Sequence, residues 1–151
     1  MRTTLEAREE ILARLSVAIE RASLATACLG EAFELLDDAG AERLEDQLFR
    51  PVQRAYARAK RAQSTFADRV GLVAPASGSP SAGPPSQGAK LLVERAAGAA
   101  AEADLVVADL QDSMLPIEAG DAELRAALAE VRELLGEVPA AAREFQRTFG
   151  R

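Results

Sequence analysis

Four stretches of the chain place apolar side chains at alternating steps of three and four residues. This spacing keeps them on one side of an α-helix, which turns once every ~3.6 residues. A stripe this long is stable only when it is buried against other helices. The clearest stripe follows the positions Leu12, Leu15, Ile19, Ala22, Thr26, Leu29, Phe33 and Leu36. The pattern therefore predicts an all-α protein built as a helical bundle.

Capping residues and prolines set the expected limits of the helices. The sequence predicts four helices, over residues 4–38, 41–70, 89–114 and 121–149. Ala39 and Gly40 are expected to stop the first helix in a left-handed turn, and Gly71 is expected to close the second. Leu115 is expected to end the third, because it precedes Pro116 and the residue before a proline avoids helical geometry.

Two further prolines fall inside predicted helices, and one long segment has no helical pattern. Pro51 predicts a kink, or a short turn just before it, and Pro139 predicts a kink in the last helix. Residues 72–88 are rich in Pro, Gly, Ser and Ala and lack apolar periodicity, so we expect them to form a flexible linker.

The short connections on either side of this linker predict two antiparallel hairpins. The expected fold is a single domain over residues 1–151, an antiparallel up-down-up-down four-helix bundle with the long linker between helices two and three. That order places the acid-rich residues 24–55 and 101–132 at one end of the bundle. It also brings alanines of helices two and three face to face. The linker leaves open a dimer in which hairpins are exchanged between chains.

Several kinds of site chemistry lack their usual residues. The chain has no histidine, so carboxylate–histidine metal sites, histidine-ligated haem and a Ser-His-Asp triad are not expected. Cys28 is the only cysteine, and we expect it to act as a small apolar filler rather than as a nucleophile. No glycine-rich phosphate loop follows a strand pattern. The sequence therefore predicts no enzyme, no cofactor and no metal site.

The expected location is the cytoplasm. No charge-free apolar run approaches the ~20 residues of a membrane span. Acidic residues such as Glu6 come too early for a secretory signal. A single cysteine cannot form an internal disulfide, which is the pattern of a reducing compartment.

The first predicted helix carries a second apolar set beside its main stripe. In an isolated bundle this set would face solvent, and its members are Val17, Leu24, Cys28 and Leu35. We interpret the set as a contact with a protein partner or with a second copy of the chain. The alternative is that the first helix is simply the most enclosed helix of the bundle.

A row of arginines follows the second predicted helix at steps of three and four, at Arg50, Arg54, Arg58 and Arg61. Such a row can meet phosphates of nucleic acid or of an anionic lipid. The net charge of −6 and the low aromatic content of 4% favour pairing with glutamates of a neighbouring helix instead. No specific nucleic acid is therefore expected as a partner.

These observations predict a non-catalytic structural or protein-interaction bundle whose partner is an unknown protein or a second copy. An alternative is a lipid- or granule-surface protein, whose hairpins open about residues 74–88 and lay their apolar faces on an interface. A third hypothesis is a carrier of an apolar small molecule in an alanine-lined centre.

Overall fold

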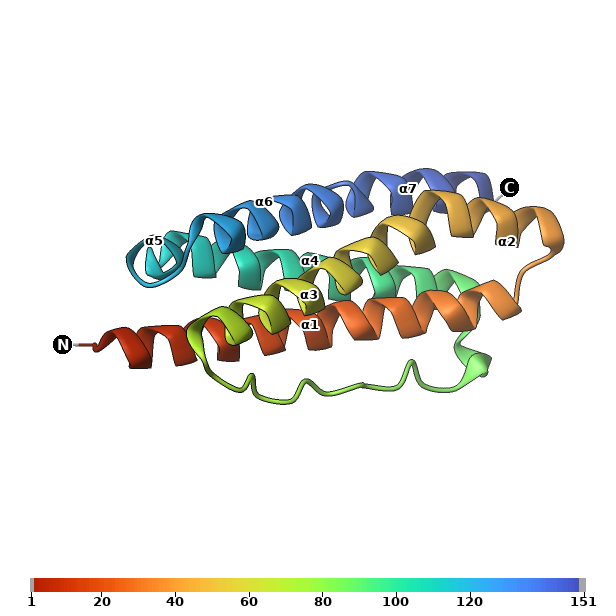
Figure 1. Ribbon diagram of the computed structural model, residues 1–151. Coiled ribbons are helices and arrows are strands. Elements are labelled where there is room, and N and C mark those ends of the chain that lie inside the picture. The colour runs from red at the N-terminus through yellow and green to blue at the C-terminus, as the bar shows by residue number, and fades with distance from the viewer. Residues whose placement is uncertain (1, 150–151) are drawn as a thin grey trace.

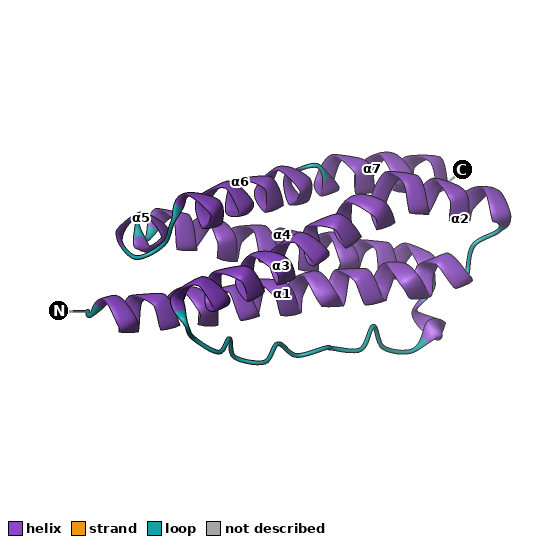
Figure 2. Ribbon diagram, in the orientation of Figure 1, coloured by secondary structure: helices purple, strands orange, loops and turns teal. Residues whose placement is uncertain are grey.

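The computed structural model describes residues 2–149, and within that range all regular secondary structure is helical (Figure 2). The all-α prediction is therefore confirmed. The elements are α1 (Thr4–Glu34), α2 (Asp38–Leu44), η1 (Glu45–Phe49), α3 (Arg50–Val70), η2 (Pro85–Gln87), α4 (Ala89–Asp112), α5 (Leu115–Glu118), α6 (Ala122–Gly136) and α7 (Val138–Phe149).

The apolar stripes form one continuous interior. Leu29 of α1, Val52 of α3, Leu92 of α4 and Leu128 of α6 are all buried in the same cluster. The predicted stripes therefore identify the core correctly, whatever the order in which the helices are connected.

The first helix ends four residues earlier than predicted. Glu34 is its last residue, and the side chain of Asp37 then accepts a hydrogen bond from the backbone N–H of Gly40 at 2.8 Å. This interaction caps a new helix that starts at Asp38. The prediction that Gly40 stops the first helix is wrong, because the Asp37 carboxylate makes Gly40 part of the first turn of α2.

The second predicted helix is continuous from α2 through η1 to α3, and Pro51 is accommodated without a break. A proline has no N–H and its ring crowds the carbonyl one turn earlier. The η1 segment is a π-helical turn, in which the Arg50 N–H bonds to the Glu45 carbonyl five residues back. The predicted irregularity before Pro51 is this wider turn. The helix then ends as predicted, at Gly71 with φ +71°.

The third and fourth predicted helices are each divided. α4 ends at Asp112, two residues before the predicted limit, and Met114 has a left-handed backbone with φ +68°. Pro116 then lies in the first turn of the short α5, where the missing N–H costs little. α6 starts after Asp121, which caps it. After a one-residue break at Glu137, α7 starts at Val138, so Pro139 is its second residue.

The chain does not alternate direction as predicted. α1 runs away from the N-terminus, α3 and α4 both run back toward it, and α6 with α7 runs away again (Figure 1). Two hydrogen bonds fix this order. Arg8 Nε at the start of α1 donates to the Ala119 carbonyl at 3.1 Å, and Gln146 Nε2 of α7 donates to the Lys90 carbonyl at 2.9 Å. The up-down-up-down prediction is therefore wrong, and the order is up-down-down-up.

This order is possible because residues 72–88, which we call the strap, run the length of the bundle between α3 and α4 (Figure 1). Helices α1 and α6 each pack against both α3 and α4, so α3 and α4 lie diagonally. The alanines of α3 therefore do not face those of α4, as the sequence predicted. The most extensive helix contact joins α1 and α4, where buried alanines of both allow a close approach.

The predicted acidic end also disappears. Residues 31–46 carry seven acidic side chains, and residues 109–123 carry five. With α4 reversed, the first group lies near the end of α1 and the second group near the start of α1 (Figure 1). The two acid-rich segments are thus at opposite ends of the molecule, and no single acidic pole forms.

Candidate functional site

The predicted apolar set on α1 is not one exposed surface. Val17 and Leu35 are 49% and 44% exposed, whereas Leu24 is half-buried against the core and Cys28 is fully buried. The prediction of a continuous exposed stripe is wrong at Cys28, because α1 is enclosed by α3, α4 and the strap. Burial raises the pKa of the Cys28 thiol, an effect that the Arg95 guanidinium partly offsets, so the thiol is protonated near neutral pH.

Two arginines of the row form ion pairs, one with a neighbouring helix and one within the same helix. Arg58 Nε lies 2.7 Å from Glu130 Oε2 on α6, and Arg50 pairs with Asp46 one turn earlier in its own helix. Arg54 and Arg61 are exposed and form no ion pair within residues 2–149. The expectation that the row pairs with a neighbouring helix therefore holds for Arg58.

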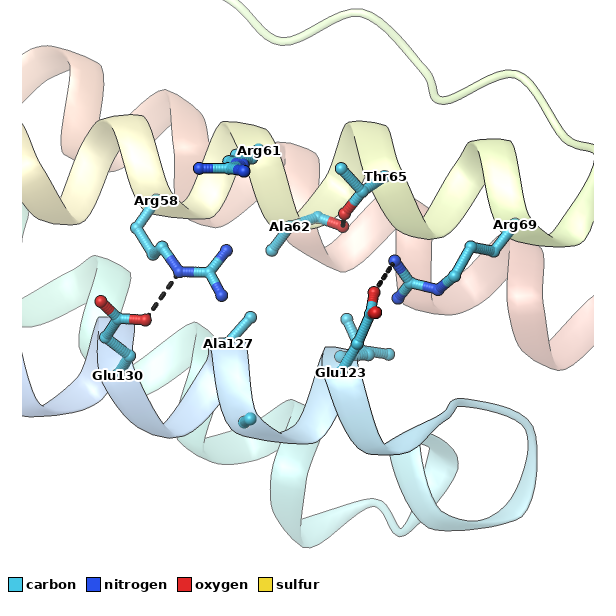
Figure 3. A pocket seen from close by; sticks show the side chains of 10 residues that line it. Arg58, Arg61, Ala62, Thr65, Arg69, Glu123, Ala127 and Glu130 are labelled. Atoms are coloured by element: carbon cyan, nitrogen blue, oxygen red, sulfur yellow. Dashed lines mark hydrogen bonds and ion pairs between the residues drawn. The ribbon is translucent and has the colours of Figure 1, made fainter.

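Arg58 and Arg69 reach from α3 toward α6 across a hollow of about 460 Å³, which Arg61 also lines (Figure 3). We call it the arginine groove, and its other lining residues are Ala62, Thr65, Glu123, Leu124, Ala126, Ala127 and Glu130. Arg69 is not in the predicted row. Its signal was present, since it continues the same helical face two turns beyond Arg61.

Arg69 forms ion pairs with two carboxylates at one end of this groove. Its guanidinium donates to both carboxylate oxygens of Asp121, at 2.7 and 2.9 Å, and lies 2.6 Å from Glu123. The Arg69 hydrogen bond, helped by the Leu124 N–H, holds the pKa of Asp121 below its usual value. The carboxylates at the start of α6 and within it thus neutralise Arg58 and Arg69. The groove is therefore a row of ion pairs between two helices and is poorly suited to bind an anion.

A second hollow, of about 730 Å³, lies between the first turns of α1 and the start of the strap. We call it the N-terminal groove, and it is lined by Leu5, Glu6, Glu9, Glu10, Leu12, Ala13, Leu72, Val73 and Pro75. Leu5 is 53% exposed and Val73 is 94% exposed. Three glutamates border these apolar side chains, and the lining contains no lysine or arginine.

The glutamates of the N-terminal groove differ in their partners. Glu10 pairs with Arg14 at 2.9 Å, and Glu6 accepts a hydrogen bond from the Thr3 hydroxyl at 3.0 Å. Glu9 is exposed and forms no ion pair within the part of the chain that the structure describes. The sequence reasoning missed this groove, whose only signal was the apolar pair Leu72 and Val73 directly before the proline-rich run.

The strap is packed along the bundle and is not the loose tether that its composition predicted. Near its start, the Ser16 hydroxyl donates to the Pro75 carbonyl at 2.9 Å. Near its end, the buried Ala82 accepts hydrogen bonds at its carbonyl from Arg95 and from Gln87 Nε2. The strap, whose composition is typical of a disordered segment, is thus held in place by hydrogen bonds at Pro75 and Ala82 and by the burial of the Ala82 methyl group.

Comparisons of the chain with family models, with curated proteins and with solved structures find no match. No described helix combines the length and apolar character needed to cross a bilayer. Residues 2–149 bring together no group of three or more His, Cys, Asp or Glu side chains able to hold a metal ion.

Proposed function

We propose that the protein is a non-catalytic interaction bundle that binds a cationic amphipathic segment of a protein partner in the N-terminal groove. One observation carries this proposal. The groove combines exposed apolar side chains, Leu5 and Val73, with a border of three glutamates and no cationic residue. An exposed apolar hollow with a charged rim is a common form of protein interaction site.

The two parts of the groove have different physical roles. Each large apolar side chain that a partner buries there contributes about 1.5–3 kcal/mol. The glutamate rim adds less affinity, but it accelerates association with a cationic partner and disfavours an anionic one. The occupant that fits is therefore a short segment with apolar residues on one side and Lys or Arg on the other.

The other hypotheses from the sequence receive less support. A lipid-surface function requires the hairpins to separate about the strap, which is held by Ser16 at one end and Arg95 at the other. The glutamate rim would also repel an anionic membrane. A carrier of an apolar molecule requires an open centre, whereas buried alanines bring α1 and α4 into close contact.

Fluorescence anisotropy with a labelled Leu/Lys amphipathic peptide of about 18 residues, or five helical turns, tests the proposal. A Leu/Glu peptide of the same pattern is the control ligand. The Leu/Lys peptide should bind, and Glu9→Lys should weaken its binding by about 3- to 10-fold, an effect that shrinks at high salt. Glu133→Lys, an exposed α6 residue without an ion pair in the described chain, is the matched control.

Three results would contradict the proposal. They are equal binding of the two peptides, equal effects of the Glu9 and Glu133 variants, and unchanged peptide binding in Val73→Asp. Flotation with vesicles but no peptide binding would favour the lipid hypothesis. A dimer seen by light scattering and abolished by Val73→Asp would make the occupant a second copy of the chain.

A further inference from the structure

A third hollow, of about 240 Å³, lies where the end of α1 packs beside the π-helical turn η1 (Figure 1). We call it the phenylalanine hollow, and it is lined by Gly30, Phe33 and Glu34 of α1 and by Glu45 and Phe49 of η1. One side of it is open to solvent. None of these five residues lines the N-terminal groove or the arginine groove.

Each of the two elements contributes one phenyl ring and one carboxylate to this hollow. On α1, Phe33 and Glu34 follow Gly30 by three and four residues, so the three share one face of the helix. On η1, Glu45 and Phe49 are the first and last residues of the π-helical turn. Single turns of this kind within an α-helix are often found at functional sites. The Phe33 ring is 37% exposed, whereas Phe49 is half-buried against the core.

Gly30 keeps the space between these side chains open. A Cβ atom at this position would have no packing neighbour within 4 Å in the described chain. The backbone of Gly30 is ordinary right-handed helix, so no turn requires a glycine here, and a glycine in a helix interior is less favourable than alanine. What this glycine supplies is room. A hollow of about 240 Å³ accommodates a group as large as a trimethylammonium ion.

The charge around the hollow is negative. Within residues 2–149, neither Glu34 nor Glu45 forms an ion pair, and no lysine or arginine lines the hollow. The nearby Arg50 pairs with Asp46 at 3.3 Å. The last turn of α1 contains no basic residue to offset the partial negative charge of the carbonyl groups at a helix C-terminus. The hollow therefore attracts a cation and repels an anion.

We propose that the phenylalanine hollow binds a small methylated ammonium ion in free solution, such as choline. The rings of Phe33 and Phe49 attract the cation through their π-electrons, and the carboxylates of Glu34 and Glu45 balance its charge. A methylated ammonium is less strongly hydrated than an unsubstituted one, so it enters a partly apolar hollow at lower cost. The site lies at the opposite end of α1 from the N-terminal groove and does not depend on the protein-binding function (Figure 1).

Four probes separate the requirements for charge, for methylation and for a free cation. They are choline, its neutral carbon isostere dimethylbutanol, the unmethylated ethanolamine, and phosphocholine, whose phosphate the carboxylates repel. In NMR titrations up to about 50 mM at constant ionic strength, suited to a millimolar Kd, choline should shift the amides of residues 30–34 and 45–49 and the ring protons of Phe33 and Phe49. Each of the other three probes should bind at least about fivefold more weakly.

Two glycines provide a matched pair of variants that test the position of the site. Gly30→Leu fills the hollow and should weaken choline binding by about tenfold or more, while leucine is a better helix former than glycine. Gly98→Leu makes the same change at an exposed position of α4, where a side chain also has open space, and should leave binding unchanged.

Two pairs of glutamates test the role of the lining carboxylates at equal net charge. Glu34→Gln combined with Glu45→Gln should weaken choline binding by about fivefold. Glu31→Gln combined with Glu42→Gln removes two charges of the same acid-rich segment outside the hollow and should weaken it by less than about twofold.

Several results would overturn the proposal. They are the absence of these shifts with choline, binding of dimethylbutanol or ethanolamine as tight as that of choline, and equal behaviour of the two leucine variants or of the two glutamate pairs. Tighter binding of phosphocholine than of choline would replace the free cation by a lipid headgroup as the ligand.

Discussion

The two sides of α3 are attached to the bundle by different chemistry. On the α6 side, exposed ion pairs of Arg58 and Arg69 span an alanine-floored groove. On the strap side, the buried Gln63 amide joins Ser16 and, through it, the Pro75 carbonyl. One helix thus displays a solvated, charged attachment and a buried, neutral attachment within a few turns of each other.

The difference between these two attachments lies in how they respond to solution conditions. Exposed ion pairs contribute about 0.2–1 kcal/mol each and are screened by salt. A buried neutral hydrogen bond contributes about as much, but its loss leaves a polar group unsatisfied at a cost of about 1–3 kcal/mol. We therefore expect the α6 side to depend on pH and salt and the strap side to depend on neither.

The largest effect is expected for Gln63→Ala, which removes two hydrogen bonds and opens a space between α1 and α3. The free energy of unfolding should fall by about 2–3 kcal/mol, measured by urea denaturation at low and high salt. Gln53→Ala, on the exposed face of the same helix, is the control and should cost less than about 0.5 kcal/mol. If the loss in free energy of unfolding caused by Gln63→Ala depended on salt, the two sides of α3 would not differ as described.

Asp121→Ala should destabilise the protein by about 1–2 kcal/mol near pH 7, because Asp121 both caps α6 and pairs with Arg69. The folded protein holds the pKa of Asp121 below its unfolded value, so this stabilisation is complete above about pH 5 and is lost as the pH falls through the folded pKa. Urea curves of wild type and variant should converge as the pH falls from about 5 through the folded pKa of Asp121. A constant difference across that range would contradict the charged attachment.

Ser16→Ala should cost about 1 kcal/mol by removing the hydroxyl between Gln63 and the strap. Its local consequence is more specific than its effect on stability. Hydrogen exchange of the strap amides near Pro75 should accelerate, while that of amides near Ala82, which has its own anchor at Arg95, should not. Uniform acceleration along the whole strap would mean that Ser16 is not a separate anchor.

The smallest effect is expected for the Arg58–Glu130 pair. A double-mutant cycle with Arg58→Gln and Glu130→Gln should give a coupling of about 0.2–1 kcal/mol that shrinks toward zero in about 0.5 M salt. The same cycle on Ser16 and Gln63 should keep its value in salt. Equal salt sensitivity in the two cycles would remove the distinction between the two sides of α3.

The sequence predicted the core well because helical periodicity reports directly on burial. Positions such as Leu12, Leu29 and Leu128 lie where their spacing placed them, and Gly71 closes its helix through a left-handed turn. The predicted limits near Gly40 were less accurate, because the Asp37 side chain competes with the glycine for the end of the helix.

The direction of the helices could not be read in the same way. An apolar stripe looks the same whether its helix runs up or down, and the strap is long enough for either order. The arginine groove depends on that order, since Arg69 at the end of α3 meets Asp121 only when α6 starts at the same end of the bundle. Arg58 could be anticipated from the arginine row, whereas its partner Glu130 could not.

The length of the strap has a consequence for the fold itself. Residues 72–84 can extend to about 45 Å, while the 24 residues of α4 cover about 36 Å that the chain must first cross. The connection is nearly taut, with slack worth about three residues. A deletion of more than about three residues makes the strap too short to reach the end of the bundle where α4 begins. The chain must then join α3 to α4 by a tight hairpin, which reverses the direction of α4. Insertions into the strap are accommodated at little entropic cost. The length of the strap, a segment rich in proline, serine and glycine, thus decides which of the two bundle topologies the chain can adopt.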